Sequence, residues 1–264
     1  MQQSFYESAI GLRTLGREGD TVRLGPEGGP AIIELTGDPD APPRPSGSTG
    51  LYHLAILVPS RVDLGQSLRR TIEAGWRFTG ASDHLVSEAL YLNDPEGNGI
   101  EIYRDRPRDQ WKRDDEGVIQ MATLPLDLDG VLGEVDAAQP SPPEVPAGTH
   151  MGHVHLQVAT IPAAEGFYSG ALGLDVTVRT YPGALFVSAG GYHHHIGLNT
   201  WESAGGSPPP EGALGLRSFE LVLPTREEAD RVAEQARATG ADVTAREDGA
   251  IVLDPWRDAV LLTA

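Results

Sequence analysis

The sequence predicts an α+β fold built from repeated βαβββ modules, and three observations lead to that prediction. Three segments share one order of features: an apolar strand, a helix, and shorter strands that end in an apolar run. A fourth segment, at the N-terminus, echoes this order without its first strand. Hydrophobic residues make up 39% of the 264 residues, which is ordinary for a globular chain able to bury two cores. We therefore expect four modules, paired into two barrel-like domains.

The N-terminal segment is the incomplete copy. Residues 4–12 (SFYESAIGL) resemble residues 166–174 (GFYSGALGL), and residues 31–35 resemble residues 99–102. No strand precedes Phe5, whereas the later copy supplies an apolar strand before its equivalent residue. We expect the first module to lack its opening strand, which a start codon assigned too far downstream would explain.

The first complete copy runs from Leu51 to Tyr103. Its apolar strand at 51–58 is stopped by Pro59, and Ser60 can cap a helix that continues to about residue 75. A strand at 86–92 then meets the turn at 94–99 (DPEGNG), and a strand at 100–103 closes the unit.

Two further copies follow the same plan. The first of these has an opening strand at 152–158, a helix that ends near Gly173, and a closing strand at 192–198. The second has an opening strand at 217–224, a helix at 225–239, and a closing run after the turn at 254–258. These copies predict the third and fourth modules.

The connections group the modules in pairs. Segments 37–50 and 202–212 are rich in Pro, Gly and Ser and join modules within a pair. The longer segment after Tyr103 is acidic and becomes Pro-rich, so we expect it to wrap one domain as the connection between pairs. The predicted organisation is an N-terminal pair at 1–110, a linker at 111–149 and a C-terminal pair at 150–264.

Charge and residue types exclude several classes of function. The formal net charge of −18 argues against nucleic acid and anionic membranes as partners, because both bind through basic patches. The chain has no cysteine, so a metal must be held by His, Asp and Glu. No run approaches the roughly 18 to 20 apolar residues of a membrane span. The N-terminus lacks the features of a signal peptide, and we expect a cytoplasmic protein with a small, weakly charged ligand.

His53 and Glu101 are the first candidates for a metal site. His53 lies midway along an opening strand and Glu101 lies on the closing strand of the same module. If the two strands are neighbours in a curved sheet, both side chains can point into its concavity and form two thirds of a facial triad for Fe(II). Glu34 is the counterpart of Glu101 in the first module and is a further candidate, although a plain strand position explains it equally well.

A second group of histidines competes for the same role. His153 and His155 are two residues apart and share a strand face, and His193 and His195 share a face of the closing strand for the same reason, with His194 pointing away. Two such strands side by side could gather four imidazoles around a transition metal. However, the position of Glu101 is Gly197 in this copy. Surface or structural roles explain the run of histidines at 193–195 equally well.

The segment from Asp83 to Glu101 resembles the signature of the extradiol ring-cleavage dioxygenases. That signature has a His, a short spacer, an apolar residue, Tyr, two residues, an Asp-Pro turn and then Glu, and here Ser82 departs from the residue type usual two positions before the His. Segments 103–107 and 186–199 extend the similarity. The chain resembles the two-domain catechol 2,3-dioxygenase-like branch of the vicinal-oxygen-chelate superfamily, which also contains glyoxalases and bleomycin-resistance proteins.

The resemblance implies a metal-dependent dioxygenase of aromatic catabolism that cleaves a catecholic substrate with dioxygen. It implies that His84 is an acid–base group, that Tyr91 hydrogen-bonds a substrate oxygen, and that His53 and Glu101 bind Fe(II). Mn(II), Ni(II) or Zn(II) are alternative metals, and a homo-oligomer is left open. Two other functions also remain open. One is a non-catalytic binder similar to bleomycin-resistance proteins. The other is a glyoxalase-like isomerase or lyase, in which Glu34 and a His from the absent opening strand join His53 and Glu101.

Overall fold

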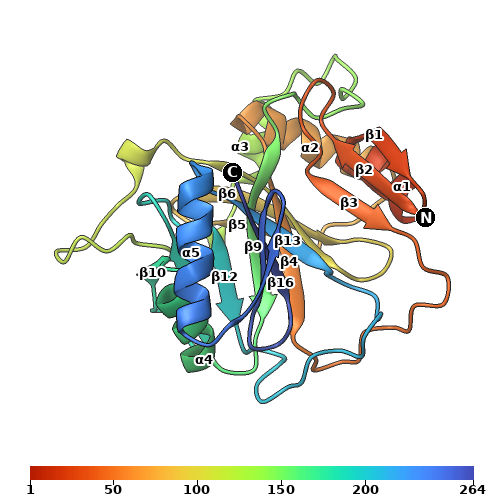
Figure 1. Ribbon diagram of the computed structural model, residues 1–264. Helices are drawn as coiled ribbons and strands as arrows, with labels where there is room; N and C mark the ends of the chain where they lie inside the picture. The colour runs from red at the N-terminus through yellow and green to blue at the C-terminus, as the bar shows by residue number, and fades with distance from the viewer. The chain divides into compact units, whose positions relative to one another are not determined.

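The computed structural model describes all 264 residues (Figure 1), and the chain divides into two compact units. Unit 1 comprises Met1–Asp40 and His53–His153, and unit 2 comprises Ala41–Tyr52 and Val154–Ala264. Unit 1 holds the first two modules and unit 2 holds the last two. None of the helices combines the length and the hydropathy that a membrane span requires.

Unit 1 begins with the module that lacks an opening strand. This module consists of α1 (Gln2–Phe5), the π-helix η1 (Tyr6–Ile10), and the antiparallel strands β1 (Arg13–Glu18), β2 (Thr21–Gly25) and β3 (Ile33–Thr36). The second module consists of β4 (Gly50–Leu57), α2 (Arg61–Glu73), β5 (Gly80–Asp83), β6 (Ser87–Asn93) and β7 (Gly99–Asp105). Its strand order is β4-β7-β6-β5, with β4 parallel to β7 and the other pairs antiparallel.

The segment after β7 packs along unit 1. It contains η2 (Arg108–Gln110), β8 (Leu124–Pro125) and α3 (Leu128–Gly133). β8 extends the sheet at the free edge of β5, where Leu124 pairs with Asp83. Further along, the backbone N–H of Val145 donates to the carbonyl of Gly11 at 3.0 Å.

The sheet of the second module has one apolar face and one face that carries polar groups. Leu54, Ile56, Ile100 and Ile102 contribute to a core with residues of α2, which begins at the N-cap Ser60. Because successive strand residues point to opposite faces, the residues between them face the other way. They include His53, Ala55, Tyr91, Glu101 and Tyr103, and the pairs Ala55–Glu101 and Tyr91–Glu101 are in register.

Unit 2 repeats the plan twice. Its elements are β9 (His150–Gln157), whose first residues up to His153 belong to unit 1, α4 (Ile161–Glu165), the π-helix η3 (Gly166–Ala171), β10 (Asp175–Val178), β11 (Ala184–Ser188), β12 (Ile196–Asn199), β13 (Ser218–Val222), α5 (Arg226–Ala238), β14 (Asp242–Arg246), β15 (Gly249–Leu253) and β16 (Ala259–Thr263). The strand orders β9-β12-β11-β10 and β13-β16-β15-β14 match the order in the second module, with the first two strands of each parallel. The α+β fold of repeated βαβββ modules, with the first module lacking its opening strand, is thus confirmed.

The similarity between residues 4–12 and 166–174 has a structural meaning. Both segments form a π-helix that is followed within two residues by a glycine with positive φ, +86° at Gly11 and +81° at Gly173. The tyrosine in each donates a hydrogen bond to the aspartate of an Asp-Pro turn: Tyr6 to Asp94 at 3.3 Å, and Tyr168 to Asp254 at 3.0 Å. An equivalent tyrosine–aspartate hydrogen bond therefore joins the first module to the second and the third module to the fourth.

Arg70 lies on α2, and its side chain is buried against η1 and the segment that precedes β9. Its side chain is 5% exposed, and its guanidinium donates to the carbonyl of Ile10 at 2.7 Å and to that of Pro142 at 3.4 Å. Burial lowers the pKa of Arg70 to about 10. Its hydrogen bonds to these backbone carbonyls and to the hydroxyl of Ser67, at 3.0 Å, stabilise the buried charge.

We expect Arg70→Ala to lower the free energy of unfolding by about 3 kcal/mol, because it leaves a cavity and the buried carbonyl of Ile10 without its donor. Urea unfolding followed by circular dichroism measures this loss. Arg69→Ala is the matched control, because Arg69 donates to backbone carbonyls of the same segment while its side chain is 20% exposed. A loss of about 1 kcal/mol or less is expected for the control, and equal losses for both variants would contradict the role of Arg70.

The turn before β16 carries a second aspartate, Asp258, where the equivalent turn carries an asparagine, Asn98. Asn98 donates its side-chain N–H to Asp94 at 2.8 Å, and Asp258 occupies the position of Asn98 in the fourth module. Burial, together with the charge of Asp254, raises the pKa of Asp258 to about 7 despite the opposing effect of Arg44. Folded protein therefore holds a proton at Asp258 that unfolded protein has lost above pH of about 4.

We expect Asp258→Asn to stabilise the protein increasingly as the pH rises from 4 to 8. The native proton at Asp258 makes the wild type lose stability between the unfolded pKa, near 3.9, and the folded pKa, near 7, and Asn removes that dependence. The stability gain should grow by about 2 to 4 kcal/mol over this range. Thermal unfolding at several pH values tests it, with the exposed Asp242→Asn as control, and a gain independent of pH would contradict the argument.

Candidate metal centre

Three buried side chains of unit 1 converge on one point. His53 on β4 and His153 on β9 place their Nε2 atoms 3.1 and 3.2 Å from Oε2 of Glu101 on β7. The possible ligand atoms of the three residues all lie within 4.8 Å of one another. The three side chains are only 8%, 1% and 4% exposed for His53, His153 and Glu101. This set of two imidazoles and one carboxylate is a preformed facial triad.

The protonation of Glu101 fits a metal ligand. Burial alone would raise the pKa of this carboxyl, but the charges and hydrogen bonds of His153 and His53 outweigh it and hold the pKa well below its ordinary value. Glu101 is therefore a carboxylate with both imidazoles directed at one of its oxygens. The donor set suits Fe(II) and is also a known set for Zn(II).

The position of His153 depends on close packing around Gly152. A Cβ added at Gly152 would lie 1.8 Å from the hydroxyl oxygen of Tyr103, so only glycine leaves room for that side chain. The ring of Tyr103 in turn lies 4.9 Å from the ring of His153. Gly152 and Tyr103 together fix the orientation of one metal-binding imidazole.

We expect Gly152→Ala to weaken metal binding about 10- to 100-fold, the usual effect of disturbing groups that orient a ligand. Tyr103 must move to make room, and the imidazole of His153 moves with it. Titration of metal-free protein with Fe(II) under anaerobic conditions, or with Zn(II), measures the change. Gly133→Ala is the control, since an added Cβ there meets nothing within 4 Å. Unchanged affinity in Gly152→Ala would show that this packing does not orient His153.

His84 and Tyr91 lie beside the triad. Tyr91 faces Glu101 across the β6–β7 pair, and its ring centre is 5.7 Å from that of His53. The hydroxyl of Tyr91 is 2.7 Å from Nε2 of His84, whose Nδ1 is 2.7 Å from the carbonyl oxygen of Ala122. Since a carbonyl can only accept, Nδ1 of a neutral His84 carries the proton, and Nε2 accepts from the hydroxyl of Tyr91.

The third module cannot repeat the carboxylate of the second. In the second module Glu101 pairs with Ala55, two residues after His53, and in the third Gly197 pairs with His155, two residues after His153. A Cβ at Gly197 would lie 2.8 Å from Cγ of His155. The imidazole of His155 therefore occupies the space where a side chain at 197 would begin. The third module thus adds no carboxylate to the set formed by His53, Glu101 and His153.

The structure places the other predicted ligands elsewhere. Glu34 lies on β3 with its side chain 58% exposed and is paired with Arg23 at 2.8 Å. The prediction that residues 192–195 belong to a strand is wrong: β12 begins only at Ile196, after a turn at Gly190 and Gly191, both with positive φ. His193 is hydrogen-bonded to His194 at 2.8 Å and His195 to Ser188 at 3.1 Å.

His153 was expected in the alternative cluster with His155, His193 and His195, and the structure groups it with His53 and Glu101. The signal for this grouping was present in the sequence, because His153 has the same position in its module as His53 has in the second. What the sequence could not supply was the proximity of His53 and His153, because the two residues are far apart in the chain.

The chain belongs to the Glyoxalase/Bleomycin resistance protein/Dioxygenase superfamily, which it matches over residues 3–102 and 150–252. It is 45% identical over 260 residues to a catechol-2,3-dioxygenase of Bacillus subtilis (strain 168), covering 97% of this chain and 90% of that protein. The resemblance expected from the segment 83–101 is thus confirmed.

Solved structures agree at the level of the fold. A putative dioxygenase from Bacillus subtilis superposes with a TM-score of 0.65 at 15% identity, over 99% of this chain and 80% of the other. Glyoxalase I from Zea mays superposes with a TM-score of 0.57 at 16% identity, over 99% of this chain and 86% of the other. At such identities these likenesses show the fold alone.

Proposed function

We propose that this protein is an extradiol ring-cleavage dioxygenase that uses Fe(II) and dioxygen to open a catecholic ring. The observation that carries the proposal is the buried set of His53, Glu101 and His153 with the His84–Tyr91 pair beside it. The 45% identity to a protein named catechol-2,3-dioxygenase supports it over nearly the whole chain. A glyoxalase-like site with two carboxylates is disfavoured, because Gly197 offers no ligand and Glu34 is exposed.

Fe(II) held by His53, Glu101 and His153 would leave adjacent coordination positions for both oxygens of a catechol and for dioxygen. Glu101 supplies the only negative charge among these ligands, and the burial of all three side chains keeps bulk water away from them. The protein thereby fixes the ligand geometry before the substrate arrives.

Tyr91 and His84 handle protons in this proposal. The hydroxyl of Tyr91 lies next to His53, so it is placed to hydrogen-bond an oxygen of a substrate bound there. Nε2 of His84 has its lone pair directed at that hydroxyl. It can accept the proton that a catechol gives up on binding, and it can return a proton as the ring opens. The carbonyl of Ala122 keeps the His84 ring in the tautomer that makes this acceptance possible.

Oxygen uptake tests the proposal directly. Protein loaded with Fe(II) under anaerobic conditions is mixed with a panel of catechols, and oxygen consumption is followed together with the yellow colour of ring-opened products. Catechol-dependent uptake by the Fe(II)-loaded protein, absent after metal removal, is the expected result. Stoichiometric metal without uptake on any catechol would refute the proposal, and tight binding of an aromatic ligand by metal-free protein would indicate a ligand-binding protein instead.

A further inference from the structure

The residue after His84 has an unusual backbone conformation. Leu85 has φ of +70°, in the tight turn that joins β5 to β6, where the N–H of His84 donates to the carbonyl of Ser87 at 2.8 Å. Turn positions with positive φ favour Gly, Asn or Asp, and a leucine there costs about 1 to 3 kcal/mol. Such a conformation persists only where the surrounding contacts impose it.

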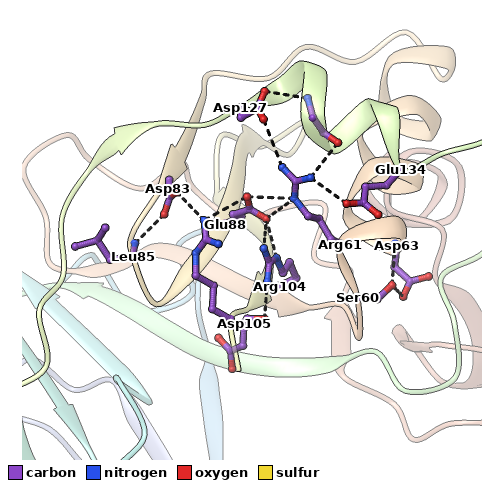
Figure 2. Close-up of polar contacts among 12 residues, drawn as sticks. Ser60, Arg61, Asp63, Asp83, Leu85, Glu88, Arg104, Asp105, Asp127 and Glu134 are labelled. Atoms are coloured by element: carbon purple, nitrogen blue, oxygen red, sulfur yellow. Dashed lines mark hydrogen bonds and ion pairs between the residues drawn. The ribbon is translucent and has the colours of Figure 1, made fainter. Parts of the chain in front are cut away.

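Asp83 supplies the contacts that hold this turn. Its Oδ1 accepts a hydrogen bond from the N–H of Leu85 at 2.9 Å (Figure 2), and its Oδ2 accepts from the guanidinium of Arg106 at 2.7 Å. The backbone N–H of Arg106 donates to the carbonyl of Val86 at 2.8 Å. Asp83 therefore binds the turn at Leu85 and Arg106 binds it at Val86, and the side chains of Asp83 and Arg106 bind each other.

The pair is itself anchored in a larger network. Glu88, which is 3% exposed, accepts from Nε of Arg61 at 2.9 Å and from Nε of Arg104 at 2.7 Å (Figure 2). It also lies 3.4 Å from the guanidinium of Arg106. Arg61 also donates to the carbonyl of Gly130 on α3. The network joins α2, β6, β7 and α3, so Arg106 has little freedom to leave Asp83.

The turn determines where the imidazole of His84 can point. Its two hydrogen bonds, to Ala122 and to Tyr91, are both 2.7 Å long, and both depend on the placement of the backbone between Asp83 and Val86. If Leu85 relaxed to negative φ, the backbone of His84 would rotate and the ring could not keep both partners. Asp83 makes no contact with the ring, so any effect on His84 passes through the backbone of the turn.

We infer that Asp83 is a positioning residue for His84: by holding Leu85 in its left-handed conformation, it fixes the direction and the tautomer of the His84 imidazole. The importance of this for catalysis rests on the proposed function, in which His84 moves protons. The orientation itself does not depend on that function and can be measured without it.

Four variants separate this role from a general effect on stability. Asp83→Ala removes the contacts to both Leu85 and Arg106, whereas Asp83→Asn keeps an oxygen that can accept from the N–H of Leu85. Leu85→Gly removes the cost of positive φ, because glycine adopts it readily. The double variant Asp83→Ala/Leu85→Gly therefore lacks the aspartate but no longer needs it to hold the turn.

Nitrogen-15 NMR of the histidine side chains in the full chain, loaded with diamagnetic Zn(II), reports the tautomer of His84. The wild type, Asp83→Asn and Leu85→Gly should show the proton on Nδ1, and Asp83→Ala should show a mixture of tautomers. The double variant should regain the wild-type form. An unchanged tautomer in Asp83→Ala, a mixture in Asp83→Asn, or no recovery in the double variant would overturn the inference.

Steady-state kinetics of the Fe(II)-loaded protein give a second readout. Asp83→Ala should lower kcat about 10- to 100-fold with little change in KM or metal content, the size expected from misplacing a catalytic group by about 1 Å. The double variant should recover most of the loss, and a loss that persists there would overturn the catalytic part. If the NMR results hold and no variant or wild type consumes oxygen with any catechol, the proposed function fails while the positioning role stands.

Discussion

Glu101→Gln should lose its metal and, with it, all oxygen uptake. The substitution keeps the shape of the side chain but replaces the buried carboxylate with a neutral amide, which is a poor ligand for Fe(II). Residues that merely orient metal ligands change affinity about 10- to 100-fold, so removal of the only anionic ligand should weaken binding by at least about two orders of magnitude. The fold should survive, because Gln can still hydrogen-bond His53 and His153.

Anaerobic titration with Fe(II), together with metal analysis after desalting, measures the effect of Glu101→Gln. Glu34→Gln is the matched control, since Glu34 has the same position in the first module but is exposed and paired with Arg23. The control should bind metal as the wild type does. Loss of metal from Glu34→Gln, or full metal binding by Glu101→Gln, would show that the centre is not the one formed by His53, Glu101 and His153.

The elements of the fold could be predicted because their signals are local. The alternation of apolar residues set the strands, and Ser60 marked the start of α2, where its side chain accepts from the N–H of Asp63. The repeated FY…GL segments predicted equivalent structures, and both became π-helices with a glycine at positive φ. The π-helical form itself was not predicted, because its i→i+5 hydrogen bonds leave no clear mark on side-chain periodicity.

The site could be predicted only in part because it depends on contacts distant in the sequence. His53 and Glu101 lie on the opening and closing strands of one module, which indicated their proximity, whereas the roles of His84 and Tyr91 were implied by the resemblance to the extradiol dioxygenase signature. The grouping of His153 with them is tertiary. Glu34 lies on the exposed face of the first module's sheet, in register with the equally exposed Arg23 on β2. The histidines at 193–195 were misassigned because the turn at Gly190 and Gly191 delays the start of β12, a conformational effect that the apolar pattern does not report.

His84→Gln should retain metal and substrate binding but lose most of its turnover. His84 lies outside the ligand set, and its ring contacts Tyr91 and the carbonyl of Ala122, so the metal site should remain intact. A glutamine side chain can hydrogen-bond to both partners but cannot accept and return a proton as imidazole does. General acid–base groups contribute about 100- to 10,000-fold to rates, and kcat should fall within that range while KM changes little.

His150→Gln provides the matched control for this prediction, because His150 is exposed and its Nδ1 also contacts a backbone carbonyl, that of Gly148, at 2.9 Å. Its kcat should equal that of the wild type. Tyr91→Phe separates the two members of the pair: it removes the hydroxyl that His84 faces but leaves the imidazole able to exchange protons with the substrate or with water. Its kcat should therefore fall less than that of His84→Gln. Equal losses would show that the proton must pass through the Tyr91 hydroxyl, and an unaffected His84→Gln would assign the proton transfer to another group.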